Sequence, residues 1–167
     1  MRSKVYIAAA LMLAAGSGSA FAQTKLVGTL NSWSFYSHEE GSTRLCFAVG
    51  APQSTEPAGA RRDAVFFYVS AWPRDGVRSE ISVKIGYPFR KGSEATVTIG
   101  NESFKLFTQE ERAFVNDPFE ELKLIEAMKK GSTMVVQGQS ERGTTTKDTY
   151  SLAGMTRAMQ SLTAGCN

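Results

Sequence analysis

Alternation of apolar and polar residues constrains this chain more than any other feature, and it is clearest in segment 80–107. Apolar residues occupy every second position in 81–85 and again in 95–99. Such alternation places apolar side chains on one face of a strand, which is typical of half-buried antiparallel sheets. The dipeptide Gly100-Asn101 predicts a tight hairpin into a third strand at Ser103–Phe107. The segment therefore predicts a β-meander.

Further strand-like segments lie on both sides of this meander. Trp33 and Phe35 share one face of an early strand by their period of two. The segment Ala64–Trp72 is almost continuously apolar, which predicts a central strand covered on both faces. The remaining strands are expected at Lys25–Leu30, 45–49, Thr133–Gly138 and Thr144–Leu152. These segments predict a mainly β, antiparallel, β-sandwich-like single domain, with two packed sheets favoured over one flat sheet.

One helix of about three turns is expected after Asp117. Asp117 suits an N-cap, Pro118 suits the first helical position, and Gly131 suits the end. We expect an inward stripe at a spacing of three residues, made of Phe119, Leu122, Ile125 and Met128. A short C-terminal helix is expected at Thr156–Thr163, with inward-facing Met155, Met159 and Leu162.

Residues 1–22 have the features of a secretory signal peptide. Two cations near the start precede an apolar run at Val5–Ala15, and Ala20-Phe21-Ala22 matches a cleavage pattern. The apolar run is shorter than the roughly 20 residues that cross a bilayer, which argues against a membrane anchor. We expect cleavage after Ala22 and a mature domain at 23–167. The expected location is the periplasm, with the outer envelope or secretion as alternatives.

The charges do not indicate a nucleic-acid partner. Loss of Arg2 and Lys4 with the signal peptide leaves 17 of the 19 basic residues against 16 acidic ones. No long basic run remains, so a nucleic-acid-binding function is disfavoured.

Two cysteines, Cys46 and Cys166, remain in the expected mature chain. An even number in an exported protein suggests one disulfide, although two free thiols are the alternative. A metal site is less favoured, because the sequence has one His and no C-x-x-C motif. The Cys46–Cys166 bond would close a loop long enough to gain roughly 4–5 kcal/mol in the chain-entropy model.

A search for catalytic residues yields little. His38 precedes Glu39-Glu40, which could form a weak metal or acid–base site, but a polar exposed loop explains the same residues. Segment 138–143 has Ser140 but lacks the second glycine of a nucleophile elbow, so a hairpin turn is the better interpretation. No motif indicates a cofactor. We therefore expect no enzymatic activity, with a periplasmic hydrolase of dispersed catalytic residues as the alternative.

Two loops give a better functional prediction than the candidate catalytic residues do, namely a binding surface. In a simple meander, loops 51–63 and 86–92 lie at the same end of the sheet. That end would carry aromatic and basic side chains, which are common in binding hot spots. The candidate partner surface consists of Arg61, Arg62, Tyr87, Phe89, Arg90 and Lys91. The alternative is that Tyr87 and Phe89 fold back and cap the core.

Several short motifs resemble the invasion-associated locus B family of exported bacterial proteins. They run in order through nearly all of the expected mature chain and are Leu26-Val27-Gly28 with Trp33, Cys46-Phe47-Ala48, Ile85-Gly86-Tyr87-Pro88-Phe89, Gly92-Ser93-Glu94, Phe104–Phe107, Ala127–Ser132, Arg142-Gly143-Thr144, Asp148–Leu152 and Cys166. The resemblance implies a compact β-rich envelope domain, associated in some bacteria with host-cell invasion, and no established catalytic residues. We therefore expect an envelope binding or accessory protein whose partner is an envelope or host protein.

Overall fold

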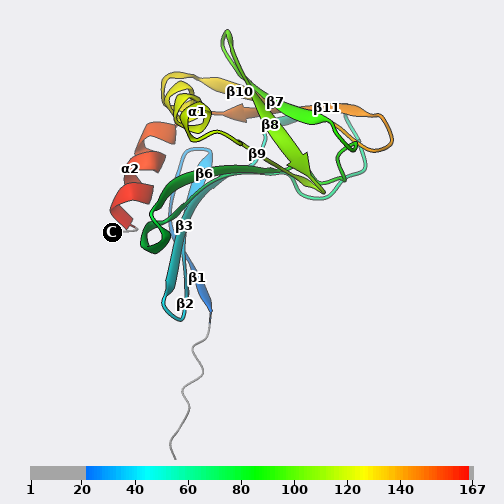
Figure 1. Ribbon diagram of the computed structural model, residues 1–167. Helices are drawn as coiled ribbons and strands as arrows, with labels where there is room; N and C mark the ends of the chain where they lie inside the picture. Colours follow the sequence, from blue (N-terminus) through cyan, green and yellow to red (C-terminus); the bar gives the residue numbers. More distant parts are fainter. Residues whose placement is uncertain (1–21, 166–167) are drawn as a thin grey trace, which may run out of the picture.

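The computed structural model describes residues 22–165 and is mainly β, with antiparallel strands and two α-helices (Figure 1). This confirms the expected fold class. The elements are β1 (Gln23–Leu30), β2 (Trp33–Glu40), β3 (Thr43–Gly50), β4 (Ser54–Glu56), β5 (Phe66–Trp72), η1 (Pro73–Asp75), β6 (Val77–Lys84), β7 (Glu94–Ile99), β8 (Glu102–Gln109), β9 (Arg112–Phe114), α1 (Pro118–Lys130), β10 (Thr133–Gln139), β11 (Thr145–Ser151) and α2 (Met155–Gly165).

All the strands belong to one hydrogen-bonded sheet of order β1-β2-β3-β5-β6-β9-β8-β7-β10-β11-β4. The sheet folds over, so that Phe67 on β5 meets Tyr150 on β11 with ring centroids 5.9 Å apart. Trp33 on β2 likewise donates its indole N–H to the Ser151 carbonyl at 3.1 Å. The two halves thus pack face to face as the sandwich prediction requires. They remain joined because the three-residue strand β9, which the sequence did not predict, pairs with both β6 and β8.

Strand β5 lies between β3 and β6, as expected for the apolar segment, but a second layer covers only one of its faces. Phe67, Val69 and Ala71 point into the core. On the other face Tyr68 is half-buried, with its ring 6.2 Å from Phe47 and 6.0 Å from Phe66. The expectation of cover on both faces was therefore wrong: aromatic neighbours in the same sheet shield the outer face.

Helix α1 begins as predicted, because the Asp117 carboxylate accepts hydrogen bonds from the N–H groups of the first turn. The predicted inward stripe is only half right. Phe119 and Leu122 are 76% and 57% exposed, whereas Leu124, Ile125, Ala127 and Met128 are buried. Positions three residues apart drift around a helix of 3.6 residues per turn, so a row at that spacing leaves the buried face.

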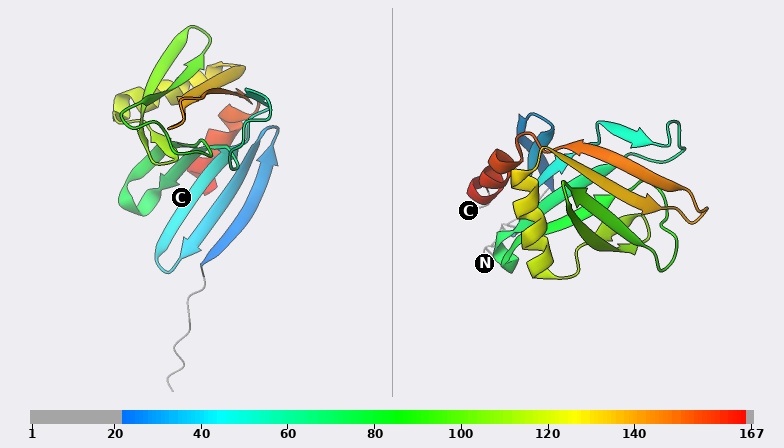
Figure 2. Two further views of the ribbon diagram at one scale, coloured as in Figure 1. Left: turned by 90° about the vertical axis from the view of Figure 1, so that its right-hand side faces the viewer. Right: turned by 90° about the horizontal axis from the view of Figure 1, so that it is seen from above.

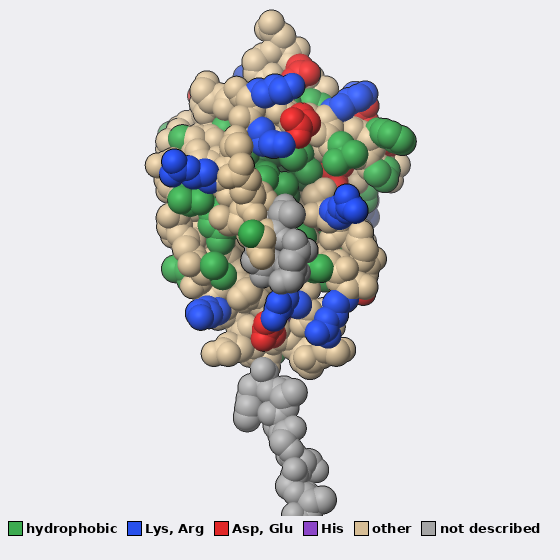
Figure 3. Space-filling model, turned by 90° about the vertical axis from the view of Figure 1, so that its left-hand side faces the viewer, with side chains coloured by type: hydrophobic (Ala, Val, Ile, Leu, Met, Phe, Trp, Pro, Cys, Tyr) green, Lys and Arg blue, Asp and Glu red, His purple; other side chains and the backbone are tan. Residues whose placement is uncertain are grey.

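Helix α2 extends the predicted C-terminal helix and buries Met155, Ala158 and Leu162. It packs on β2 and β3 and touches α1. The two helices close one end of the folded sheet, opposite the turn between β10 and β11 (Figure 2). The face of the molecule that carries the helices shows basic and acidic side chains beside one another, with hydrophobic ones in several separate groups (Figure 3).

Cys46 lies on β3 and is buried. Cys166 lies outside the described residues, so the Cys46–Cys166 disulfide stays a prediction.

Candidate functional site

Three loops meet at the end of the molecule opposite the helices, and we call residues 57–63, 86–92 and 139–144 the loop end. The Asp63 N–H donates to the Gly86 carbonyl at 2.9 Å. Gly86 has φ +79°, and a Cβ there would lie 2.3 Å from the Asp63 carbonyl oxygen. Only glycine permits so close an approach in that conformation. The prediction that the first two loops share one end is confirmed.

The β10–β11 turn joins them through backbone bonds. The Arg90 N–H donates to the Gln139 carbonyl at 2.9 Å, and the Glu141 N–H donates to the Pro88 carbonyl at 3.0 Å. Segment 138–143 therefore forms the expected hairpin turn rather than a nucleophile elbow. The turn brings the exposed side chain of Arg142 to the loop end, a residue that the sequence-based surface did not include. Sequence alternation alone did not place it there, because β7, β8, β9, α1 and β10 separate this turn from loop 86–92.

The six residues of the candidate surface differ in how exposed their side chains are. Three cations, Arg61, Arg90 and Lys91, are exposed. Tyr87 and Phe89 are only 5% and 4% exposed, as the alternative interpretation of these rings proposed. Their rings pack edge to face with centroids 5.7 Å apart. Because they cap the core, these rings offer almost no area to a partner.

Arg62, which the sequence placed in the candidate partner surface, is instead buried in an ion pair with Asp148 of β11. The guanidinium binds the carboxylate with two hydrogen bonds, one of them from Nη1 to Oδ2 at 2.8 Å. The side chains are 6% and 0% exposed. The hydrogen bond that Arg62 donates to Asp148 outweighs the cost of burial and raises the pKa of Arg62, which therefore stays charged. This pair fastens the loop before β5 to the far half of the sheet.

Inward-facing polar side chains on β11 lie beside this ion pair. Together they form the floor of a pocket at the loop end. Thr146 precedes Asp148 on the same face, and its hydroxyl lies 2.7 Å from the Tyr87 hydroxyl. Burial raises the pKa of Tyr87 and, more strongly, that of Tyr150. Within residues 22–165 the buried Tyr150 hydroxyl has no hydrogen-bond partner. The alternation of Thr146, Asp148 and Tyr150 could have indicated an inward polar row.

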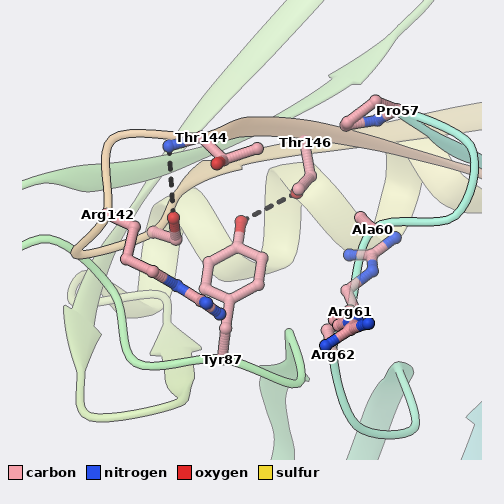
Figure 4. A pocket seen from close by; sticks show the side chains of 9 residues that line it. Pro57, Ala60, Arg61, Arg62, Tyr87, Arg142, Thr144 and Thr146 are labelled. Carbon is pink, nitrogen blue, oxygen red and sulfur yellow. Dashed lines mark hydrogen bonds between the residues drawn. The ribbon is translucent and has the colours of Figure 1, made fainter.

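Above this floor is an open depression of about 290 Å³ (Figure 4). Its walls include Arg61 and Arg62 on one side and Arg142 with Thr144 on the other. Ser140 also lines it. We call this depression the arginine pocket. A neighbouring depression of about 530 Å³ shares the three arginines and adds two carboxylates, those of Asp63 and Glu111.

Among the described residues, none that lines the arginine pocket is placed to act as a base on the Ser140 hydroxyl. Ser140 Oγ accepts the Thr144 N–H at 3.2 Å, and no His, Asp or Glu lines the pocket. His38 is on β2 with Nδ1 2.6 Å from the Thr24 hydroxyl, and Glu40 lies 4.0 Å from its Nε2. In the part of the chain that the structure describes, no three His, Cys, Asp or Glu residues are grouped as metal ligands would be.

The fold and the site define a class: an antiparallel β domain with two helices at one end and a basic pocket at the other. A family model described as invasion associated locus B (IalB) protein matches residues 33–163, and the chain belongs to this family. The crystal structure of invasion associated protein B from Bartonella henselae has the same fold, with a TM-score of 0.59 and 16% sequence identity over 84% of this chain and 97% of that chain. No match is found among curated proteins. None of the helices within residues 22–165 is long and apolar enough to span a membrane.

Proposed function

We propose that this protein is exported to the bacterial cell envelope and acts there by binding a partner through its loop end, without catalysing a reaction. One observation carries the proposal: three separate loops bring the exposed cations Arg61, Arg90, Lys91 and Arg142 to one end. Exposed arginines held on a rigid frame are frequent in protein interfaces. The membership in the invasion associated locus B family and the signal-like residues 1–22 support the envelope location.

The chemistry of the loop end favours binding over hydrolysis. A hydrolase needs a base within hydrogen-bond reach of its nucleophile and donors for the developing negative charge. Ser140 has a backbone N–H as its hydrogen-bond partner, and the single histidine of the sequence lies on β2 beside Thr24. The hydroxyl and guanidinium groups that line the pocket can donate hydrogen bonds, and the hydroxyls can also accept them.

Site-specific photo-crosslinking in intact cells tests the binding role. A photoreactive residue at Arg61 should capture a partner that is absent when the same residue stands at Arg157. Arg157 is a matched control, because it is an exposed arginine on α2 at the opposite end. Equal capture from both positions, or none from Arg61, Arg90 and Arg142, contradicts the proposal. Fractionation of the same cells distinguishes periplasm, outer envelope and medium.

We also propose the disulfide between Cys46 and Cys166, which is consistent with an exported protein. Its support is the packing of α2 on β3, since α2 ends at Gly165 and β3 carries the buried Cys46. Alkylation of the denatured exported protein without reductant should add no label, and prior reduction should allow two. Two labels without reduction would contradict the bond.

A further inference from the structure

Two arginines of the arginine pocket have no ion-pair partner among the described residues. Arg61 and Arg142 make no ion pair within residues 22–165, and no Asp or Glu lines the pocket. The only carboxylate bound to one of its arginines is Asp148, which is completely buried behind Arg62. Two of the three guanidinium groups therefore have no carboxylate in an ion pair with them, although the carboxylates of Asp63 and Glu111 line the neighbouring depression.

Arg62 is held in place and still has donors to spare. A guanidinium has five N–H groups. The bonds seen for Arg62 use three of them, two toward Asp148 and one toward the Ile85 carbonyl at 3.5 Å. The remaining N–H groups belong to a side chain whose position is fixed by the ion pair, so binding with them costs little side-chain entropy.

The opposite wall supplies a third cation and hydroxyl groups. Arg142 extends from the β10–β11 turn, and Thr144 lies beside it (Figure 4). Ser140 also lines the pocket. The volume of about 290 Å³ is near the lower end of the range found for small-molecule sites. The pocket therefore fits a small anion with a polar body better than an extended polymer.

We propose that the arginine pocket binds the phosphate group of a small ligand, and this inference rests on the proposed binding function of the loop end. A phosphate monoester carries a charge of about −1.5 to −2 near neutral pH and three acceptor oxygens. Its three oxygens can accept hydrogen bonds from more than one guanidinium group, whereas a carboxylate offers two oxygens in one plane. Arginine forks match phosphate oxygens with paired, charge-assisted hydrogen bonds.

The phosphate can come from two sources, a phosphorylated sugar or free inorganic phosphate. A sugar would place hydroxyl groups near Ser140 and Thr144, which both donate and accept hydrogen bonds. The source is distinguished by whether the sugar body adds affinity to that of the phosphate alone.

Isothermal titration calorimetry on the protein purified after export tests the inference with glucose 1-phosphate, inorganic phosphate and glucuronate. Both phosphates should bind and glucuronate should bind at least about tenfold more weakly. Tighter binding of glucose 1-phosphate assigns a phosphorylated sugar, and equal binding assigns free phosphate. Glucuronate binding as tightly as the phosphates, or no binding of either phosphate, overturns the inference. So does binding only to phosphatidylglycerol vesicles in a co-sedimentation assay.

Variants locate the binding. Arg61→Gln and Arg142→Gln should each weaken phosphate binding by about tenfold or more, because each removes charge-assisted hydrogen bonds. Arg142→Lys should lose less, since it keeps the charge without the fork. Arg157→Gln on α2 is the matched control and should bind normally. These side chains are exposed, so unchanged circular dichroism is expected throughout. Equal affinity in Arg61→Gln, Arg142→Gln and the control would overturn the inference.

The two proposals fail separately. Capture of a partner from Arg61 without phosphate binding leaves the binding function standing and removes the phosphate inference. Phosphate binding without any captured partner supports the pocket and contradicts a macromolecular partner at the loop end.

Discussion

The Arg62–Asp148 ion pair gives the sharpest test of how this fold is held together. We consider the substitution Asp148→Asn, which keeps the shape of the side chain and removes its charge. Because the two side chains are 6% and 0% exposed, the substitution leaves a buried guanidinium without a counter-charge. Breaking such a pair costs roughly 3–5 kcal/mol. We expect about 3 kcal/mol, since an amide oxygen can still accept one hydrogen bond.

That loss is a large part of the roughly 5–15 kcal/mol by which domains of this kind are stable. Urea unfolding followed by tryptophan fluorescence should therefore show a much lower midpoint with an unchanged slope. The double variant Arg62→Met/Asp148→Leu removes both charges and should lie close to the native midpoint, because apolar pairs often replace buried ion pairs without loss. The single variants Arg62→Met and Asp148→Leu, measured together with this double variant, give the coupling energy.

An exposed ion pair provides the control. Arg44 and Glu39 lie 2.7 Å apart on β3 and β2, with side chains 43% and 59% exposed. Arg44→Gln should cost less than about 1 kcal/mol. The reasoning would be refuted if Asp148→Asn were no more destabilising than Arg44→Gln, or if the double variant lost the sum of the two single losses.

Further predictions concern the core and the packing of the loop end. Phe67→Ala should cost roughly 3–5 kcal/mol of unfolding free energy, because Phe67 faces the core. Tyr68→Ala should cost clearly less, because the neighbouring Tyr68 lies on the outer face of β5. Tyr150→Phe should be neutral or stabilising and Tyr87→Phe should cost about 1 kcal/mol, because only the Tyr87 hydroxyl has a partner. Burial raises the pKa of Tyr150 above its value in the unfolded chain, which is near 10. The contribution of Tyr150 to the unfolding free energy is therefore fully present below about pH 10 and is lost as the pH rises above it. Urea midpoints measured from pH 8 to 11 should therefore fall less steeply in Tyr150→Phe. Gly86→Ala should lower the urea midpoint strongly, because its Cβ would strike the Asp63 carbonyl; an unchanged midpoint would contradict the close packing of the two loops.

Local signals predicted the architecture well. Alternation of apolar residues marked the meander, and Asp117-Pro118 marked the start of α1, because both features depend on residues close in the sequence. The errors arose where tertiary context decides. Strand β9 has three residues, too few for a periodic pattern, yet it joins the two halves of the sheet. The inward stripe of α1 failed because a spacing of three alone does not follow one helix face.

The candidate site was predicted only in outline. Meander topology brought loops 51–63 and 86–92 together, and the structure agrees. Burial of Arg62 could not be foreseen, because its partner Asp148 is 86 positions away and lies on a strand with its own local pattern. Tyr87 is of a residue type that is common in binding hot spots, but its hydroxyl is hydrogen-bonded to Thr146 inside the protein. Composition predicts which residues can bind a partner, whereas burial decides which ones are available.

The buried ion pair connects the fold to the pocket. For stability alone, an apolar pair at these two positions would serve as well as charges do. A fixed guanidinium with unused N–H groups at the wall of an open depression has a use that an apolar pair lacks, because it can hold an anion. The double variant Arg62→Met/Asp148→Leu separates the two roles, since it should fold with near-native stability and bind phosphate more weakly. Native affinity in that variant would mean that the pair serves the fold alone and that Arg61 and Arg142 make up the binding site.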